Sequence, residues 1–228
     1  MLLNRTSLVA SLAFAAVVTL SACGPAGVNG SVEVPAGATS DSATTVNGAV
    51  NVGDGAKIGK AATVNGAIHL GQNVTADSAK AVNGGIEIGG GTRVANDVVA
   101  VNGSIRLAKD ADISGRVTNV NGAIRLEGAR VGGDITTFNG DITLGAGSRV
   151  EGGIRVEKPE FSTEPSNIPT VTIGPDAVVD GTLKFDREVK LYVHESAKIG
   201  PVEGATAVRF SGDSPGSGGT VSAAVEAE

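Results

Sequence analysis

The sequence has few of the side chains that fill a broad globular core. It contains no tryptophan, one tyrosine, five phenylalanines, one methionine and one cysteine among 228 residues, whereas 34 residues are glycine. Abundant Val, Ile, Ala and Thr can instead fill a narrow core, because β-branched side chains pack well on pleated surfaces. A single cysteine excludes an internal disulfide.

Clusters of basic residues are also missing. The chain has 18 Lys and Arg against 24 Asp and Glu, which gives a formal net charge of −6. A negative balance without a basic run argues against nucleic acid as a partner and against electrostatic adhesion to anionic lipid. No Cys/His spacing typical of a metal site occurs, and we expect no cofactor.

Residues 1–22 have the features of an export signal. One charge, Arg5, precedes an apolar run of 13 residues from Leu8 to Leu20. This run is too short to span the membrane as a helix, which takes about 20 residues. We therefore predict that residues 1–22 form a signal peptide that is removed from the mature protein.

The tetrapeptide Leu20-Ser21-Ala22-Cys23 follows the apolar run directly and resembles a bacterial lipobox. The resemblance implies that Cys23 is lipidated and that residues 23–27 form a lipidated N-terminus and a short linker. It also implies a bacterial cell-envelope location. By analogy with proteins that have a lipobox, Gly24 after the cysteine, rather than Asp, implies the outer membrane, facing the periplasm or the surface. The alternative is a small-residue cleavage site with an incidental cysteine.

An Asn-Gly pair returns along most of the chain at spacings of 18, 18, 18, 19, 19 and 18 residues. A fixed period near 20 residues marks a solenoid, in which each unit must stack on its neighbours to bury its apolar side. Stacked Asn amides could also hydrogen-bond along the axis, as amide ladders do between stacked strands. The predicted corner ladder consists of Asn29, Asn47, Asn65, Asn83, Asn102, Asn121 and Asn139.

Within each unit the residues alternate as in a β-strand with one buried face. For Val120 to Leu126 we expect Val120, Ile124 and Leu126 to point inward, Asn121-Gly122 to turn the corner with positive φ, and Arg125 to be exposed. Further apolar residues in the second half of each unit indicate two or three strands per coil. The outward row between the two inward positions contains Glu33, Asn51, His69, Glu87, Arg106, Arg125 and Thr143.

We therefore predict an all-β fold, a single-stranded parallel β-helix over residues 28–210, with about nine coils of 18–19 residues, triangular and right-handed. A lone Asn-Gly usually indicates a hairpin. A meander of hairpins would not require units of nearly equal length. The first unit, residues 29–46, is expected to be a cap, because Pro35 and the polar run Thr39-Ser40-Asp41-Ser42 interrupt the pattern.

Residues 157–169 break the period with three prolines, which exclude an interior strand and predict an insertion loop. Insertions in solenoids often lie on the binding face, so Glu160, Phe161 and Glu164 are candidate contact residues. The alternative is that Phe161 folds back over a coil. Residues 211–228 are rich in Gly, Ser and Ala and are expected to be a disordered tail.

No catalytic or metal-ligating constellation emerges from the residues. The two histidines, His69 and His194, are far apart in sequence. Asp134, Asp141 and Glu151 lie at expected corner or outward positions, where solvated acids are common. We therefore expect no enzyme activity.

The recurrent Val-Asn-Gly followed by an alternating strand resembles the adhesin-like β-strand repeats of unassigned function, over residues 28 to about 156. The stretches Arg149–Ile154 and Val171–Gly181 also resemble bactofilins, which are polymer-forming right-handed β-helices. The predicted export signal and the lipobox-like tetrapeptide of this chain depart from that family, which usually works on the cytoplasmic side.

These observations favour a non-catalytic, lipid-anchored scaffold or adhesin-like protein of the cell envelope. Its expected contacts are a membrane through the N-terminal lipid, a second copy through the coil ends, and an envelope polymer. The alternative function is binding or modification of an envelope polysaccharide by an outward face near residues 157–169.

Overall fold

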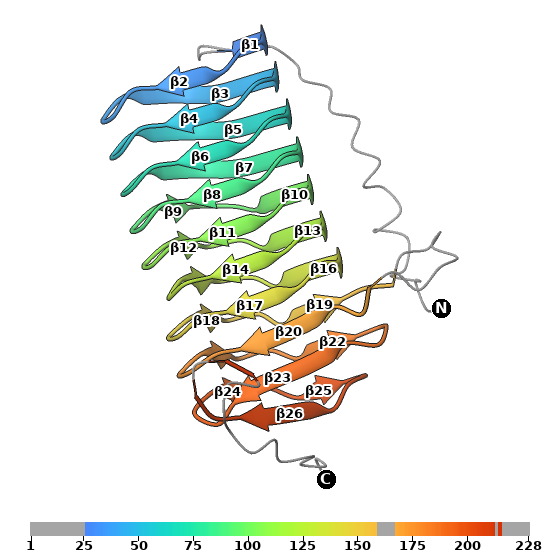
Figure 1. The fold of residues 1–228 in the computed structure, drawn as a ribbon. Coiled ribbons are helices and arrows are strands. Elements are labelled where there is room, and N and C mark those ends of the chain that lie inside the picture. Colours follow the sequence, from blue (N-terminus) through green and yellow to red (C-terminus); the bar gives the residue numbers. More distant parts are fainter. Residues whose placement is uncertain (1–25, 159–166, 213, 216–228) are drawn as a thin grey trace, which may run out of the picture.

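The computed structural model describes residues 26–158, 167–212 and 214–215. Within these residues it contains 26 β-strands and no helix, and thus no helix that could span a membrane. All paired strands run parallel. As the chain descends in Figure 1, the front strands run left and the strands behind run back to the right, so the coil is right-handed. The predicted parallel β-helix is confirmed.

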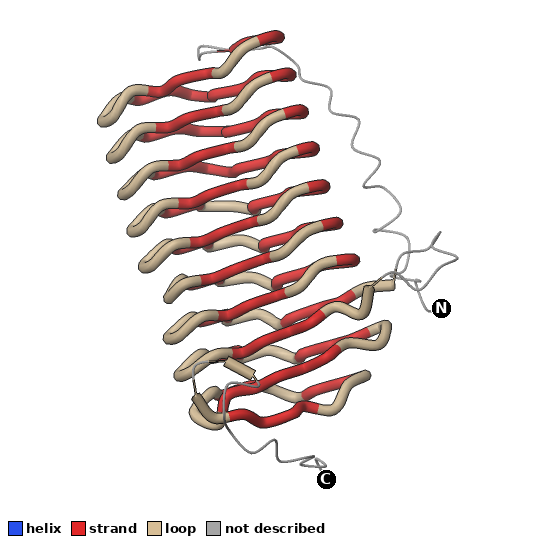
Figure 2. Tube along the Cα trace, viewed as in Figure 1, coloured by secondary structure: helices blue, strands red, loops and turns tan. Residues whose placement is uncertain are grey.

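One sheet has ten strands, one from each coil, so the structure has ten coils rather than about nine. Figure 2 shows strands stacked on strands and turns stacked on turns along the rod. In stacking order the strands are β2 (Val32–Val34), β4 (Val50–Val52), β6 (Ile68–Leu70), β8 (Ile86–Ile88), β11 (Ile105–Leu107), β14 (Ile124–Leu126), β17 (Ile142–Leu144), β20 (Thr170–Ile173), β23 (Lys190–His194) and β26 (Ala207–Phe210).

The other sheet has 16 strands and forms the two remaining sides of each coil. In the first coils these two sides are one nine-residue strand, as in β3 (Thr39–Asn47), β5 (Lys57–Asn65) and β7 (Thr75–Asn83). β1 (Ala26–Asn29) pairs with the second half of β3.

Later coils split this strand in two, which gives three strands per coil. The second side contains β9 (Arg93–Val94), β12 (Asp112–Ile113), β15 (Arg130–Val131), β18 (Arg149–Val150), β21 (Val178–Val179) and β24 (Lys198–Ile199). The third side contains β10 (Val98–Asn102), β13 (Val117–Asn121), β16 (Ile135–Asn139), β19 (Ile154–Val156), β22 (Leu183–Phe185) and β25 (Val202–Glu203).

Aliphatic rows fill the narrow core, as the alternating pattern predicts. The third and fifth residues after each Asn are buried, and Ile124 and Leu126 are at most 1% exposed. The row on the second side is buried as well, and it contains Ile58, Val94, Ile113, Val131 and Val150. The core therefore runs the length of the rod.

The prediction that Val120 and its equivalents point inward is wrong. Val120 is half-buried on the outside of the third side, and its predecessor Asn119 is fully buried. The inward row is small or polar because the corner leaves little room and its carbonyls need donors. Thr45 and Thr63 donate to the carbonyls of Gly30 and Gly48, each at 2.9 Å.

Glycine follows each ladder Asn because successive coils come very close at this corner. A Cβ added to Gly84 would lie 1.8 Å from the carbonyl oxygen of Gly66, and one added to Gly140 would lie 1.9 Å from that of Gly122. Positive φ occurs at several of these glycines, but the lack of room applies even at Gly84, where φ is not positive.

The opposite corner is where non-glycine residues adopt the left-handed conformation. Asn73, Asp110 and Asp176 have φ of 54°, 61° and 53°. They occupy the register that other coils fill with glycines such as Gly55, at φ 69°. Asn and Asp tolerate this conformation better than other L-residues do. These coils therefore have Gly, Asn or Asp at this register.

Polar residues replace aliphatic ones in the core rows at both ends of the rod. The run Thr39–Ser42, predicted to interrupt the first unit, is instead the first half of β3, and Ser40 pairs with Ile58 of the next coil. At the other end Arg209 pairs with Val193 and donates to the carbonyl oxygens of His194 and Ala197, at 3.2 and 3.4 Å. Arg209 therefore covers the C-terminal end of the core with charge.

We predict that Gly84→Ala destabilises the rod strongly, whereas Gly55→Asn does not. The alanine Cβ would collide with backbone that cannot move without shifting a coil, at a cost of about 1–3 kcal/mol or more. Asn at position 55 enters a left-handed register already occupied by Asn73 and should change stability by about 0.5 kcal/mol at most. Thermal melts followed by circular dichroism compare the two variants, and equal melting temperatures would contradict the steric explanation.

Candidate functional site

Several features predicted from the sequence lie outside the described residues. These are the signal peptide (1–22), the lipidation site Cys23, the candidate contact residues Glu160, Phe161 and Glu164, and most of the tail predicted for 211–228. The structure brings together the seven corner asparagines and the outward row of the ten-stranded sheet.

The asparagine side chains form one continuous hydrogen-bonded ladder at the corner between the third side and the ten-stranded sheet. Each Asn donates through Nδ2 to Oδ1 of the Asn in the preceding coil. The donor–acceptor distances are 2.9 Å (Asn47 to Asn29), 2.8 Å (Asn65 to Asn47), 2.9 Å (Asn83 to Asn65), 3.0 Å (Asn102 to Asn83), 2.9 Å (Asn121 to Asn102) and 3.1 Å (Asn139 to Asn121).

An arginine closes the ladder at its C-terminal end. Because every amide donates in the same direction, the terminal acceptor is Oδ1 of Asn139. Arg187 Nη1 donates to this oxygen at 2.7 Å and to the carbonyl oxygen of Phe138 at 3.1 Å. A guanidinium is well suited to this place because it meets the oxygen end of six aligned amide hydrogen bonds.

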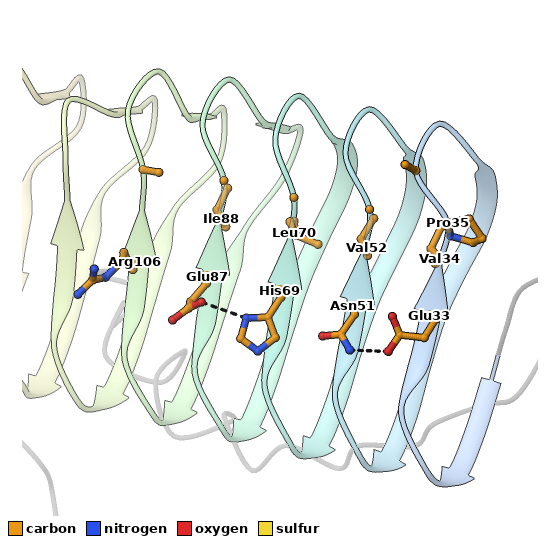
Figure 3. A pocket seen from close by; sticks show the side chains of 15 residues that line it. Glu33, Val34, Pro35, Asn51, Val52, His69, Leu70, Glu87, Ile88 and Arg106 are labelled. Atoms are coloured by element: carbon orange, nitrogen blue, oxygen red, sulfur yellow. Dashed lines mark hydrogen bonds and ion pairs between the residues drawn. The ribbon is translucent and has the colours of Figure 1, made fainter.

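An open groove of about 540 Å³ runs across the first five coils on the outside of the ten-stranded sheet. Figure 3 shows Glu33, Asn51, His69, Glu87 and Arg106 projecting from successive strands along it. The strand register places these side chains one coil apart, as the sequence predicts. The groove therefore presents a polar side chain about every 4.8 Å along the rod.

Neighbouring polar side chains in the groove pair with each other. Asn51 Nδ2 donates to Glu33 Oε1 at 2.5 Å, and His69 Nδ1 lies 3.0 Å from Glu87 Oε2. Arg106 does not pair with Glu87. Its Nη1 instead lies 3.6 Å from Glu127 Oε1 in the next coil, beyond the groove. All these groups are exposed, so each ion pair contributes only about 0–1 kcal/mol to stability.

A row of small residues opens the groove, and the sequence reasoning did not recognise it. The sixth residue after each Asn is Gly53, Gly71 and Gly89 in three successive coils, with Ala108 in the next. A Cβ on Gly53 would lie 2.5 Å from the backbone nitrogen of Ala36. The repeated glycine at one register was the available signal, but close packing between coils explains it as well as a groove does.

The second side carries an ion-pair network. Arg130 Nη1 lies 2.5 Å from Asp112 Oδ1, and its Nε and Nη2 donate to the carboxylate of Glu151 at 3.0 and 2.8 Å. Arg149 Nη2 donates to Asp180 Oδ2 at 2.6 Å. Hydrogen bonds to Glu151 and then Asp112 raise the pKa of Arg130, which keeps the guanidinium charged. This side is therefore polar and self-paired.

The outside of the third side is almost free of charge from β1 to β16. We call this surface the Val–Asn face and define it by three outward rows, of which the first is the Asn ladder. The second row contains Val28, Val46, Val64, Val82, Val101, Val120 and Phe138, and the third contains Ala26, Thr44, Ala62, Lys80, Val99, Thr118 and Thr136. Val28 is 58% exposed, and the other residues of the second row are half-buried.

Charge returns on the third side directly beyond this face. Glu157 follows β19 and is half-buried. Burial raises the pKa of its carboxyl, the neighbouring Asp186 raises it further, and Arg155 and Lys184 oppose the shift. The segment predicted to be an insertion loop, residues 157–169, begins at the same residue, so the Val–Asn face ends where that segment begins.

The groups considered for catalysis do not converge. Five strands of the ten-stranded sheet lie between β6, which contains His69, and β23, which contains His194. Asp134 and Asp141 accept backbone hydrogen bonds from Gly153 and Thr170, each at 2.8 Å. No cluster of three or more His, Cys, Asp or Glu residues that could hold a metal occurs in the described part of the chain.

No protein-family model matches the chain, and neither a curated protein nor a solved structure matches it. The resemblances to adhesin-like repeats and bactofilins therefore stay predictions.

We predict that Asn102→Asp weakens the ladder in a pH-dependent way. The introduced carboxylate can still accept from Asn121 but cannot donate to Asn83, and the lost hydrogen bond costs about 1 kcal/mol. The protonated carboxyl can donate, so the folded state should raise its pKa above the unfolded value of about 3.9. Stability relative to the unaltered chain should then be lost as pH rises through the folded pKa.

Melting temperatures measured between pH 4 and 8 test this expectation. Asn96→Asp is the matched control, because it makes the same chemical change at an exposed residue outside the ladder. If the melting temperature falls equally in both variants, or if its fall in Asn102→Asp does not depend on pH, the role of the ladder is contradicted.

Proposed function

We propose that this chain is a non-catalytic, lipid-anchored scaffold of the bacterial cell envelope that presents its long outer surfaces for adhesion. The observation that carries the proposal is the unbroken stack of ten coils, the first seven of which are joined by one amide ladder. A rod built in this way holds side chains in fixed rows over its whole length. This arrangement suits presentation of an extended surface better than enclosure of a small substrate.

Support for the anchor comes from the sequence. The apolar run before Leu20-Ser21-Ala22-Cys23 provides an export route, and β1 begins at Ala26, three residues after the cysteine. A lipid on Cys23 would therefore hold the first coil close to the membrane surface. Firm attachment requires more than one acyl chain, which is what the resemblance to a lipobox implies.

Cys23→Ser tests the anchor in the full chain expressed in a bacterium. The unaltered protein should incorporate labelled fatty acid and sediment with membranes, and the variant should do neither. Ala22→Ser is the control, since it keeps the cysteine and a small residue before it. An unaltered protein that takes up no fatty acid would rule out the lipid anchor.

A second candidate function is binding of an envelope polysaccharide, which the groove over the first five coils favours. The groove is open along the rod and offers carboxylate, amide, imidazole and guanidinium groups at regular intervals. Polar groups of this kind suit a linear polymer with hydroxyl or amide groups. This placement differs from the predicted face near residues 157–169.

Binding to purified envelope polysaccharide, measured by co-sedimentation, tests this candidate. Replacing both members of the His69–Glu87 pair by alanine should lower the retained fraction several-fold, and Thr136→Ala on the third side should not. Scaffold and polysaccharide binder should both leave the polymer intact. Release of soluble fragments by the unaltered protein would show an enzyme instead.

A further inference from the structure

We infer that the Val–Asn face binds the same face of a second copy of this chain, so that two rods associate side by side with two-fold symmetry. This goes beyond the scaffold role, because it identifies the surface and the partner.

The charge distribution favours association at this face. Among its 21 outward side chains only Lys80 is charged, whereas 18% of the residues in the whole chain are charged. Copies of a chain with a net charge of −6 repel each other. That repulsion is weakest where both surfaces are neutral, and the cores of protein interfaces are depleted in charged residues.

The row of valines gives the face an apolar ridge that the core does not use. Val46, Val64 and Val82 point outward from successive strands, and Phe138 ends the row. Neighbouring side chains in the row cover only part of each of them, so they are half-buried. Contact with a second surface would remove the rest of their apolar area from water.

The spacing of the rows selects a partner with the same repeat. Side chains recur about every 4.8 Å along the rod. A second copy offers the same interval over the same number of coils, so every row can be engaged together. A peptide strand laid along the rod would offer side chains at intervals of about 3.3 Å and would fall out of step.

The exposed asparagines still have hydrogen-bonding capacity. A primary amide has two N–H donors and an oxygen with two lone pairs. Within the ladder, Asn83 donates one hydrogen bond to Asn65 and accepts one from Asn102. The remaining donor and lone pair can therefore meet the Asn row of a second copy.

The size of the face predicts a weak pair. Seven strands at about 4.8 Å and five residues at about 3.3 Å give roughly 500 Å² per copy. The total of about 1,000 Å² lies at the low end of specific interfaces, where complexes are transient. Association through the coil ends is disfavoured at the C-terminus, where Arg209 takes the core position that Val193 holds in the coil before.

Cysteine cross-linking in the full chain tests the pairing. Val82 is the central residue of the valine row, so Val82→Cys should give a covalent dimer several-fold above the unaltered chain after mild oxidation. Thr143→Cys, on the outside of the ten-stranded sheet, is the matched control and should give none above that background. In a parallel pair, Val46→Cys of one copy also cross-links to Val46→Cys of the other copy. In an antiparallel pair, Val46→Cys of one copy cross-links to Val120→Cys of the other. Either pattern supports a second copy.

A charge placed on the face should separate the rods. Adding Val101→Asp to Val82→Cys should lower the cross-linked fraction about tenfold while circular dichroism still shows the folded chain, because Val101 points outward and is not part of the core. If Val82→Cys reacts with a maleimide but never cross-links, the inference fails. It also fails if the cysteine is protected from maleimide in dilute, monomeric protein, since something other than a second copy then covers the face. Loss of the lipid on Cys23 alone would leave the inference standing.

Discussion

Close approach of backbone between successive coils at the Asn-Gly corner is the constraint on which the structure depends. A Cβ added to Gly66, Gly84 or Gly140 would lie within 2 Å of a carbonyl oxygen in the preceding coil. Only glycine leaves room for this approach, and parallel strands require it if their hydrogen bonds are to continue around the corner. The fixed corner keeps each Asn directly over the one before, so the amide ladder follows from the same constraint.

Polar side chains make hydrogen bonds on both the outside and the inside of the corner. Outside, the exposed amides bond to each other and end on Arg187. Inside, Thr45, Thr63 and Asn119 satisfy carbonyl oxygens that would otherwise be buried without a donor. Hydrogen bonds therefore stabilise the corner on its outer and on its inner side. Two polar atoms inside the corner, Asn119 Oδ1 and Thr137 Oγ1 in adjacent coils, are buried without a partner, which is costly.

The three sides of the rod differ in chemistry. The ten-stranded sheet carries the groove with its paired polar side chains, and the second side carries the Arg130 and Arg149 ion pairs. The Val–Asn face of the third side has Lys80 as its one charge. Because one coil contributes to all three sides, each surface extends along several coils without any change of fold. The proposed ligand and the proposed second copy would therefore lie on different sides of the same rod.

The sequence by itself determined the period, the parallel stacking, the corner asparagines and the aliphatic rows at Ile124 and Leu126, because these depend on local alternation repeated at a fixed interval. It did not determine the direction of Val120. A valine looks the same in a core row as on an outward ridge, and the true inward row of Thr, Ala and Asn has no hydrophobic signal. Arg187 at the end of the ladder, Arg209 over the core and the groove beside Gly71 appeared only in the tertiary structure. Each depends on residues of different coils meeting in space, and the insertion at 157–169 removes the register that would have aligned the last coils in sequence.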